Sequence, residues 1–386
     1  MYSNYKLLNV KLRMPKDQEL FPDVSRPKNV GVYSVSPEGE FENFNKRMRF
    51  FQPSVTCPFA LGANENLLQD EDVANRSYLD TLLLFLTSTH ERRQLIMETE
   101  FVCSRDVLVL LLCTPFDRKK KWSIAVSKYR NTIYMCLVPD EDVVEQLDNT
   151  RFQILYKNSL LKNLKEHCLV SRVEDLDRIE DYEQRTENGQ LYGVFKTTFD
   201  GSILLFDAPV TAEKTNNYAL NGKFKNCSLT NTGSFGQPTT FVDLRLRQDT
   251  MSGPEWAAHH TNEMILWWAE CFLTGIETIH VAHYDKNLIV NRFHDLVVLD
   301  LHLECKKHWS PSACANFLSR FLMDIKKLMS HVDSSSAVYM VEYDPKGEGI
   351  TYTVEAERNE HTFIPDWYTK KFNLNGSSSM PFEYSV

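Results

Sequence analysis

The sequence predicts a single α+β domain whose sheet is mostly antiparallel and in part mixed. Three observations lead to this fold class: short alternating segments joined by turn signals, a few longer segments with helical spacing of apolar residues, and no linker-like stretch between them. With 386 residues, of which 42% are hydrophobic and 25% charged, the chain has the composition of a globular protein with a large core. We therefore expect one domain over residues 1–372 and a flexible polar tail over 373–386.

Hairpins are the clearest elements. In LYGVFKTTF–DG–SILLFDAPV (191–210), Asp200 and Gly201 supply the positive φ angles of a tight two-residue turn. Three further hairpins are predicted in 122–138, 278–293 and 337–357, and isolated strands in 6–12, 29–35, 47–51 and 239–247. Most of the sheet should therefore be built from strands that are neighbours in the sequence.

Four segments have helical spacing. SYLDTLLLFLTSTHERRQLI (77–96) predicts one helix with Ser77 as its N-cap, and GPEWAAHHTNEMILWWAECFLTG (253–275) one that Gly275 closes. SPSACANFLSRFLMDIKKLM (310–329) predicts a helix capped by Ser310. FVCSRDVLVLLLCTPF (101–116) is expected as a buried helix that Pro115 ends, although its β-branched residues leave a strand open.

Several broad classes are excluded or disfavoured. The longest apolar run, LVLLLC at 108–113, is too short to span a bilayer, so no membrane partner is expected, and no secretory signal is seen at the start. Nine cysteines without a C-x-x-C pair suggest reduced thiols in the cytosol or nucleus. The net charge of −9 argues against a general nucleic-acid coat without excluding a nucleic-acid enzyme. Phosphate-loop, dinucleotide and hydrolase-elbow motifs are missing.

Several segments, taken together, resemble one known family. FVCSRDVLVLLLCTPF with KKKWSIAVSKYRNTIYM, then DYEQR, LLFDAPV, FVDLRLR, MILWWAECFLTG, SPSACANFLSRFL and FIPDWY come in the order of the DXO (Dom3Z-type) decapping exoribonucleases, which act on RNA 5′ ends. The likeness runs from about Arg26 to Tyr368. It implies two mostly antiparallel, partly mixed sheets flanked by helices around a deep central pocket. It also implies an RNA 5′ end or nucleotide as ligand and Mg²⁺ or Mn²⁺ as cofactor, and leaves a protein partner open.

The family's motifs transfer unevenly to this chain. Arg105 matches the arginine that opens the first motif, which implies a role in substrate binding. Glu183 matches a glutamate at the end of the second motif, although the glycine of that motif is missing. The third motif, Glu-x-Asp after Leu-Leu-Phe, falls on Pro209 and Thr211, so both of its acids are absent.

Two further positions are altered rather than lost. Asp243 and Arg245 stand where the family has Glu-x-Lys, and Glu270 stands where it has a glutamine after Trp-Trp-Ala. The resemblance therefore gives Glu183, Asp243, Arg245 and Glu270 as catalytic positions.

These departures predict an impaired metal site. Mg²⁺ requires oxygen ligands in near-octahedral order, and two divalent ions need several carboxylates to offset their charge. Proline offers no ligand and threonine only a neutral hydroxyl, so Glu183, Asp243 and Glu270 remain as candidate ligands for one weakly held ion or none. Arg245 has the reach to lie across the vacated space and pair with Asp243 or Glu183.

Three readings of function remain open at this point. The first is a binding protein for RNA 5′ ends that hydrolyses little or nothing. The second is an active metal-dependent decapping enzyme (pyrophosphohydrolase and deNADding) and 5′–3′ exoribonuclease with one rearranged ion. The third is a protein-interaction scaffold with a vestigial pocket.

Each residue also has a plain structural alternative. Asp207 and Glu213 flank the lost acids on the same strand face; a bulge at Pro209 would bring Asp207 inward, but exposed acids at strand ends are the more common case. In these alternatives, Arg105 serves only its own helix, Glu183 belongs to a solvated helix, and Asp243 with Arg245 forms a surface ion pair worth about 0–1 kcal/mol.

Overall fold

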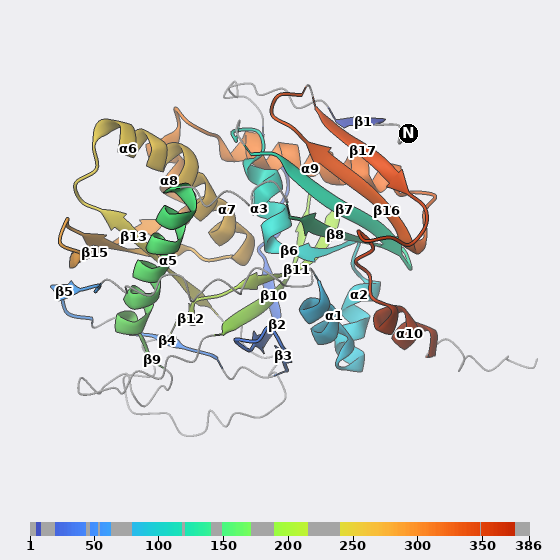
Figure 1. The fold of residues 1–386 in the computed structure, drawn as a ribbon, viewed down its shortest axis with the longest axis horizontal. Helices are drawn as coiled ribbons and strands as arrows, with labels where there is room; N and C mark the ends of the chain where they lie inside the picture. The colour runs from blue at the N-terminus through green and yellow to red at the C-terminus, as the bar shows by residue number, and fades with distance from the viewer. Residues whose placement is uncertain are drawn as a thin grey trace, which may run out of the picture.

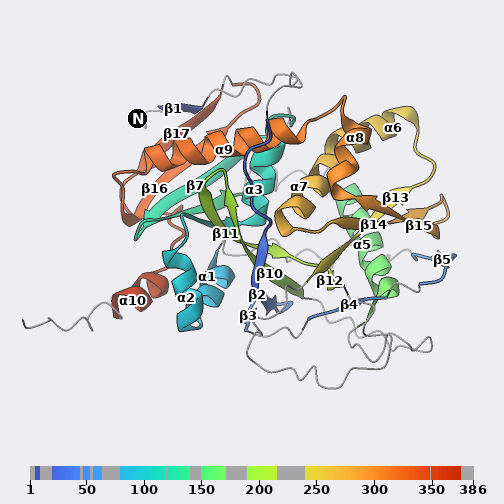
Figure 2. The same ribbon diagram turned by 180° about the vertical axis from the view of Figure 1, so that it is seen from behind.

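The computed structural model describes residues 5–8, 20–43, 47–52, 55–62, 79–117, 120–139, 149–170, 189–214, 240–347 and 349–374. Two mixed sheets form its frame (Figures 1 and 2). The ten-stranded sheet has the order β1 (Tyr5–Leu8), β17 (Ile350–Glu355), β16 (Ser334–Tyr343), β7 (Trp122–Tyr129), β8 (Thr132–Val138), β6 (Phe101–Ser104), β11 (Ser202–Pro209), β10 (Gln190–Phe199), β2 (Lys28–Val35) and β3 (Phe41–Glu42). The seven-stranded sheet has the order β5 (Phe59–Ala60), β15 (Ile289–Val297), β14 (Thr278–Tyr284), β13 (Phe241–Gln248), β12 (Ala212–Glu213), β4 (Phe50–Phe51) and β9 (Leu169–Val170).

Helices cover both sheets. The α-helices are α1 (Asp80–Thr87), α2 (His90–Met97), α3 (Arg105–Cys113), α5 (Asn149–Cys168), α6 (Gly253–Ala258), α7 (Met264–Thr274), α8 (Leu301–Cys305), α9 (Pro311–Leu328) and α10 (Asp366–Leu374). A π-helical turn, η3 (His259–Glu263), joins α6 to α7, and a 3-10 turn, η4 (Val298–Asp300), precedes α8. In the described part of the chain, none of the helices has the length and apolar content needed to span a bilayer.

The largest core lies between the two sheets. Side chains of α3, α7 and α9 pack there against one face of each sheet, for example Phe206 of β11 and Val281 of β14. A second core, with Leu205 of β11, lies under α1, α2 and α10 on the outer face of the ten-stranded sheet. A third core packs α5 on the opposite face of the seven-stranded sheet, against Leu244 of β13. These layers confirm the α+β class and the two mixed sheets flanked by helices.

The predicted hairpins are confirmed, with the register that their turns imply. Asp200 (φ 47°) and Gly201 (φ 77°) form the turn between β10 and β11, and Arg130 (φ 52°) and Asn131 (φ 64°) the one between β7 and β8. The predicted helix of 253–275 runs through α6, η3 and α7 and ends at Gly275 with φ 69°, where a side chain would be strained.

Two local expectations were wrong in part, and one helix was missed. The helix expected over 77–96 is divided into α1 and α2, because Thr89 caps a new helix by accepting a hydrogen bond from the backbone N–H of Arg92. The helix expected over 101–116 begins only at Arg105, because residues 101–104 fill the gap between β8 and β11 as a central parallel strand. The helix α5 had not been predicted at all.

The tail boundary shifts slightly. Helix α10 continues to Leu374, past the expected start of the tail at residue 373, and residues 375–386 lie outside the described part.

Candidate functional site

The candidate site lies where the chain passes from one sheet to the other. Strand β11 ends at Pro209 in the ten-stranded sheet and β12 begins at Ala212 in the seven-stranded sheet. The ladder between β12 and β13 has two pairs, Ala212 with Val242 and Glu213 with Phe241. Thr211 therefore lies just beyond the end of this ladder. At the same end, Asp243 follows Val242 in β13. Pro209 and Thr211 are both half-buried at this junction.

Strand alternation divides the side chains of β13 between two surroundings. Val242 and Leu244 belong to the core under α5. Asp243 instead meets α7, where it accepts a hydrogen bond from the Cys271 thiol at 3.3 Å. Burial and the neighbouring Asp243 raise the pKa of Cys271, which keeps the thiol protonated and able to donate.

Arg245 bridges two of the candidate acids. Its Nε donates to Asp243 Oδ2 at 2.6 Å, and its Nη2 pairs with Glu270 Oε2. The three side chains are only 12–21% exposed, so this is a largely desolvated ion triad rather than a surface pair. Burial alone would lower the pKa of Arg245, but Asp243 and Glu270 outweigh it and raise the pKa, so the guanidinium remains charged. The expected pairing of Arg245 with Asp243 is confirmed.

Arg105 approaches the same glutamate from the ten-stranded sheet. It is the first residue of α3, and its Nη2 lies 3.6 Å from Glu270 Oε1 and 3.2 Å from the exposed Asp106. Each oxygen of Glu270 thus faces a different guanidinium. The buried Nε of Arg105 has no hydrogen-bond partner. The structure therefore brings Arg105, Asp243, Arg245 and Glu270 together, whereas Glu183 lies outside the described residues.

The two substitute acids do not join this group. Asp207 was expected as an exposed acid, but it is 7% exposed and accepts a hydrogen bond from the hydroxyl of Tyr33, on the face of β11 that α1 covers. Glu213 is half-buried in β12, where burial raises its pKa. The sequence did not indicate that Asp207 is a core residue. Alternation shows which residues of a strand share a face, but it does not show that both faces of β11 are buried.

We expect Tyr33→Phe to lower the free energy of unfolding by about 1–3 kcal/mol, because the buried carboxylate of Asp207 loses a hydrogen-bond donor. Denaturant unfolding of the variant measures this loss. Tyr352→Phe, at a half-buried tyrosine of β17, is the matched control and should change stability by less than about 0.5 kcal/mol. Equal effects of the two substitutions would show that Asp207 does not depend on this hydroxyl.

A divalent metal does not fit the residues that the structure describes. Asp243 and Glu270, the two candidate ligands that lie within the described residues, are both engaged by Arg245. Among the described residues, no three His, Cys, Asp or Glu side chains gather closely enough to hold a metal ion. Two ions would need several free carboxylates, and a single one would compete with the guanidinium for the same oxygens.

One cation near the site had escaped the sequence analysis. Lys165 is a half-buried residue of α5, and its amine interacts electrostatically with Asp243 and Glu270. Burial lowers the pKa of Lys165; the two acids offset part of this effect, whereas Arg245 and Arg49 add to it. Leu160, Leu164 and Cys168 are spaced as the buried face of a helix and would have indicated α5, but not where Lys165 points.

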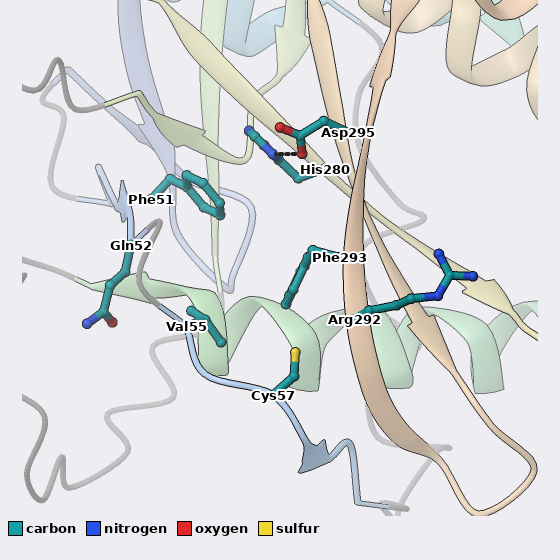
Figure 3. A pocket seen from close by; sticks show the side chains of 8 residues that line it. All are labelled: Phe51, Gln52, Val55, Cys57, His280, Arg292, Phe293 and Asp295. Atoms are coloured by element: carbon teal, nitrogen blue, oxygen red, sulfur yellow. Dashed lines mark hydrogen bonds and ion pairs between the residues drawn. The ribbon is translucent and has the colours of Figure 1, made fainter.

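A separate hollow lies on the other face of the seven-stranded sheet. Its volume is about 410 Å³, and it is lined by Phe51, Gln52, Val55, Cys57, His280, Arg292, Phe293 and Asp295. Figure 3 shows the Phe293, Val55 and Cys57 side chains turned toward a common space, with the His280–Asp295 hydrogen bond (2.6 Å) at its edge. His280 points away from the side on which its neighbours Ile279 and Val281 pack with α7. This hollow is therefore distinct from the candidate site, and the deep central pocket stays a prediction.

The chain resembles known proteins over almost its whole length. A model of the RAI1-like PD-(D/E)XK nucleases matches residues 25–369. Protein cutoff of Drosophila melanogaster is 30% identical over 380 residues, which cover 95% of this chain and 94% of that protein. Decapping and exoribonuclease protein of Bos taurus is 24% identical over 387 residues, which cover 92% of this chain and 89% of that protein.

Solved structures show the same fold at low sequence identity. Scheffersomyces stipitis Rai1 in complex with (3′-NADP)⁺ and calcium ion has a TM-score of 0.70 and 14% identity, covering 95% of this chain and 100% of that one. Candida albicans Rai1 in complex with pU5-Mn²⁺ has a TM-score of 0.67 and 12% identity, with the same coverage. Divalent metal and phosphorylated ligands thus occur in proteins that share this fold.

Proposed function

The chain belongs to the RAI1-like PD-(D/E)XK nuclease family, and from this premise we propose that it binds the 5′ ends of RNA and hydrolyses them little or not at all. The observation that carries the proposal is the bridge from Arg245 to both Asp243 and Glu270. A tethered guanidinium is placed where a nuclease of this family would need free carboxylates. The ligand is proposed from the decapping exoribonucleases among its relatives and from the pU5 complex of Candida albicans Rai1.

Electrostatics supports the loss of turnover. A divalent ion about 4 Å from the Arg245 charge would be repelled by roughly 8 kcal/mol at an effective dielectric constant of about 20. The carboxylates that offset such repulsion in a metal-dependent nuclease are replaced here by Pro209 and Thr211. Arginine does not release its proton, so the obstacle persists at every physiological pH.

The cysteines of the described residues are free thiols. Together with the proposed ligand, this favours a reducing compartment, and we extend the proposal to the cytosol or nucleus.

Turnover of end-labelled RNAs tests the proposal. The panel has monophosphate, triphosphate, unmethylated-capped and NAD-capped 5′ ends, each incubated with Mg²⁺ and with Mn²⁺. We expect no metal-dependent release of cap or nucleotides, together with measurable binding of at least one of these ends.

The two other readings are separate outcomes of this assay. Metal-dependent release that disappears in Glu183→Ala would establish an active enzyme with a rearranged site and refute the proposal. Folded protein that neither binds nor cleaves any member of the panel would refute it as well and would favour a scaffold whose surface matters.

A further inference from the structure

The charge balance of the site is the reverse of what a metal centre needs. Three cations, Arg105, Arg245 and Lys165, lie around the two acids Asp243 and Glu270, and the exposed Asp106 adds one more negative charge beside Arg105. Arg49 adds a further positive charge near Lys165. Among the described residues, therefore, positive charge exceeds negative charge at the centre of the site. Such a place favours an anion over a metal ion.

Lys165 is the cation left over in this arrangement. Arg245 holds one oxygen of each acid, and within the described structure the Lys165 amine makes neither a hydrogen bond nor an ion pair. A half-buried ammonium without a partner costs free energy, part of which an anion placed against it would recover. The buried Nε of Arg105 is a second donor without a partner on the other side of Glu270.

The site can be approached from solvent along one edge of β13. β12 pairs with β13 only as far as Val242. Within the described residues, β13 therefore has no strand neighbour on the β12 side from Asp243 to its end. Helix α5 packs on β13 (Figure 1), and the Lys157–Glu263 ion pair connects α5 to η3. Leu266, one turn before Glu270 on the same face of α7, is 41% exposed. Arg105, Arg245 and Glu270 keep 12–21% of their side-chain surface exposed, so the site is in part open to solvent.

We propose that Lys165 and Arg105 bind the 5′-terminal phosphate of RNA directly at this place, with no divalent ion between protein and phosphate. The inference rests on the proposed function and adds to it the group that is recognised and the residues that recognise it. Arg105 supplies a planar donor and Lys165 a compact point charge, whereas Arg245 serves as the fixed cation that neutralises the two acids. Binding should then survive removal of divalent metal and weaken with added salt.

Binding of a fluorescent RNA with a 5′-monophosphate, compared with the same RNA carrying a 5′-hydroxyl, tests this proposal. Each is titrated with the full chain in EDTA and in Mn²⁺. We expect the monophosphate RNA to bind more tightly, equally well in both buffers. Lys165→Met should weaken its binding roughly 10- to 100-fold, as for loss of a hydrogen bond to a charged group, and leave the 5′-hydroxyl RNA almost unchanged.

Two variants separate the charge from the fold. Lys327→Met removes the same charge from the exposed surface of α9 and should bind as the parent does. Lys165→Arg keeps the charge in α5 and should retain most of the phosphate preference. A thermal melt of each variant shows whether it is folded. If Lys165→Met does not fold, Lys165→Gln is tested instead, and we expect it to lose the preference for the 5′-monophosphate.

The outcomes distinguish this inference from the proposed function. Monophosphate RNA that binds only with Mn²⁺, or equally to Lys165→Met, would refute direct recognition while leaving 5′-end binding intact. Folded protein without preference for any 5′ end would refute the proposed function itself. Unlabelled RNA, inorganic phosphate and a nucleoside monophosphate are each used to compete with the fluorescent RNA. If the two small phosphates compete as strongly as the unlabelled RNA does, the site binds free phosphates, and the assignment to RNA is overturned.

Discussion

Arg245→Met is expected to lower the free energy of unfolding by about 3 kcal/mol, because the largely buried carboxylates of Asp243 and Glu270 each lose the guanidinium that they pair with directly. Asp243 and Glu270 would then face each other without the cation that separates their charges. Methionine keeps most of the volume of the side chain, so the loss measures charge rather than a cavity. Denaturant unfolding at neutral pH and low salt gives the difference directly.

A surface pair provides the comparison for this effect. Arg358 pairs with Asp366, and both side chains are more than half exposed, so Arg358→Met should cost less than about 1 kcal/mol. If the two substitutions cost the same, Arg245 is not the internal cation of the site, and the main support for lost turnover is removed.

Local chemistry made much of the fold predictable. The Asp200–Gly201 turn and the Arg130–Asn131 turn define hairpins by themselves, since each two-residue turn sets the register of its strands. Ser310 caps α9 as its sequence predicts, by accepting a hydrogen bond from the backbone N–H of Ala313. These elements depend on contacts within a few residues.

One failure depends on contacts between distant segments, and another on a local capping signal. Residues 101–104 have the apolar content of a helix start, but they form a strand because β8 and β11 offer backbone partners on both sides. Thr89 interrupts a continuous apolar pattern because its side chain caps a new helix, a signal that the spacing of leucines hides. For residues 101–104, pairing with distant strands overrides the local preference for a helix.

The site residues also divide into those that the sequence indicates and those that only the packing brings into place. The residues Arg105, Asp243, Arg245 and Glu270 were found by their place in the family's motifs, and the Arg245–Asp243 pair by the two-residue spacing of a strand. Lys165 belongs to no such motif, and its place beside the acids results from the packing of α5 on β13. Glu183 lies outside the described residues, so its role stays a prediction.

Restoring acids at the junction of the two sheets should create metal affinity that the parent lacks. In the variant Pro209→Glu with Thr211→Asp, two carboxylates are added at the junction of the two sheets, one at the end of β11 and one next to the end of the β12–β13 ladder, and we expect Mn²⁺ to bind more tightly than to the parent. The guanidinium of Arg245 still occupies the Asp243 and Glu270 oxygens in this variant. Adding Arg245→Lys returns a compact ammonium that can withdraw from them, so the triple variant should bind Mn²⁺ at least about tenfold more tightly than the double.

Calorimetric titration with Mn²⁺ ranks the parent, the double and the triple variant. Thr198→Glu with Asn291→Asp adds the same two acids at exposed positions of β10 and β15 and should not raise the affinity, because scattered carboxylates do not share one ion. A triple variant no better than this control would mean that Pro209 and Thr211 do not stand at the lost ligand positions. A double variant equal to the triple would mean instead that Arg245 is no obstacle to a metal ion, and lost turnover would then follow from the two missing acids alone.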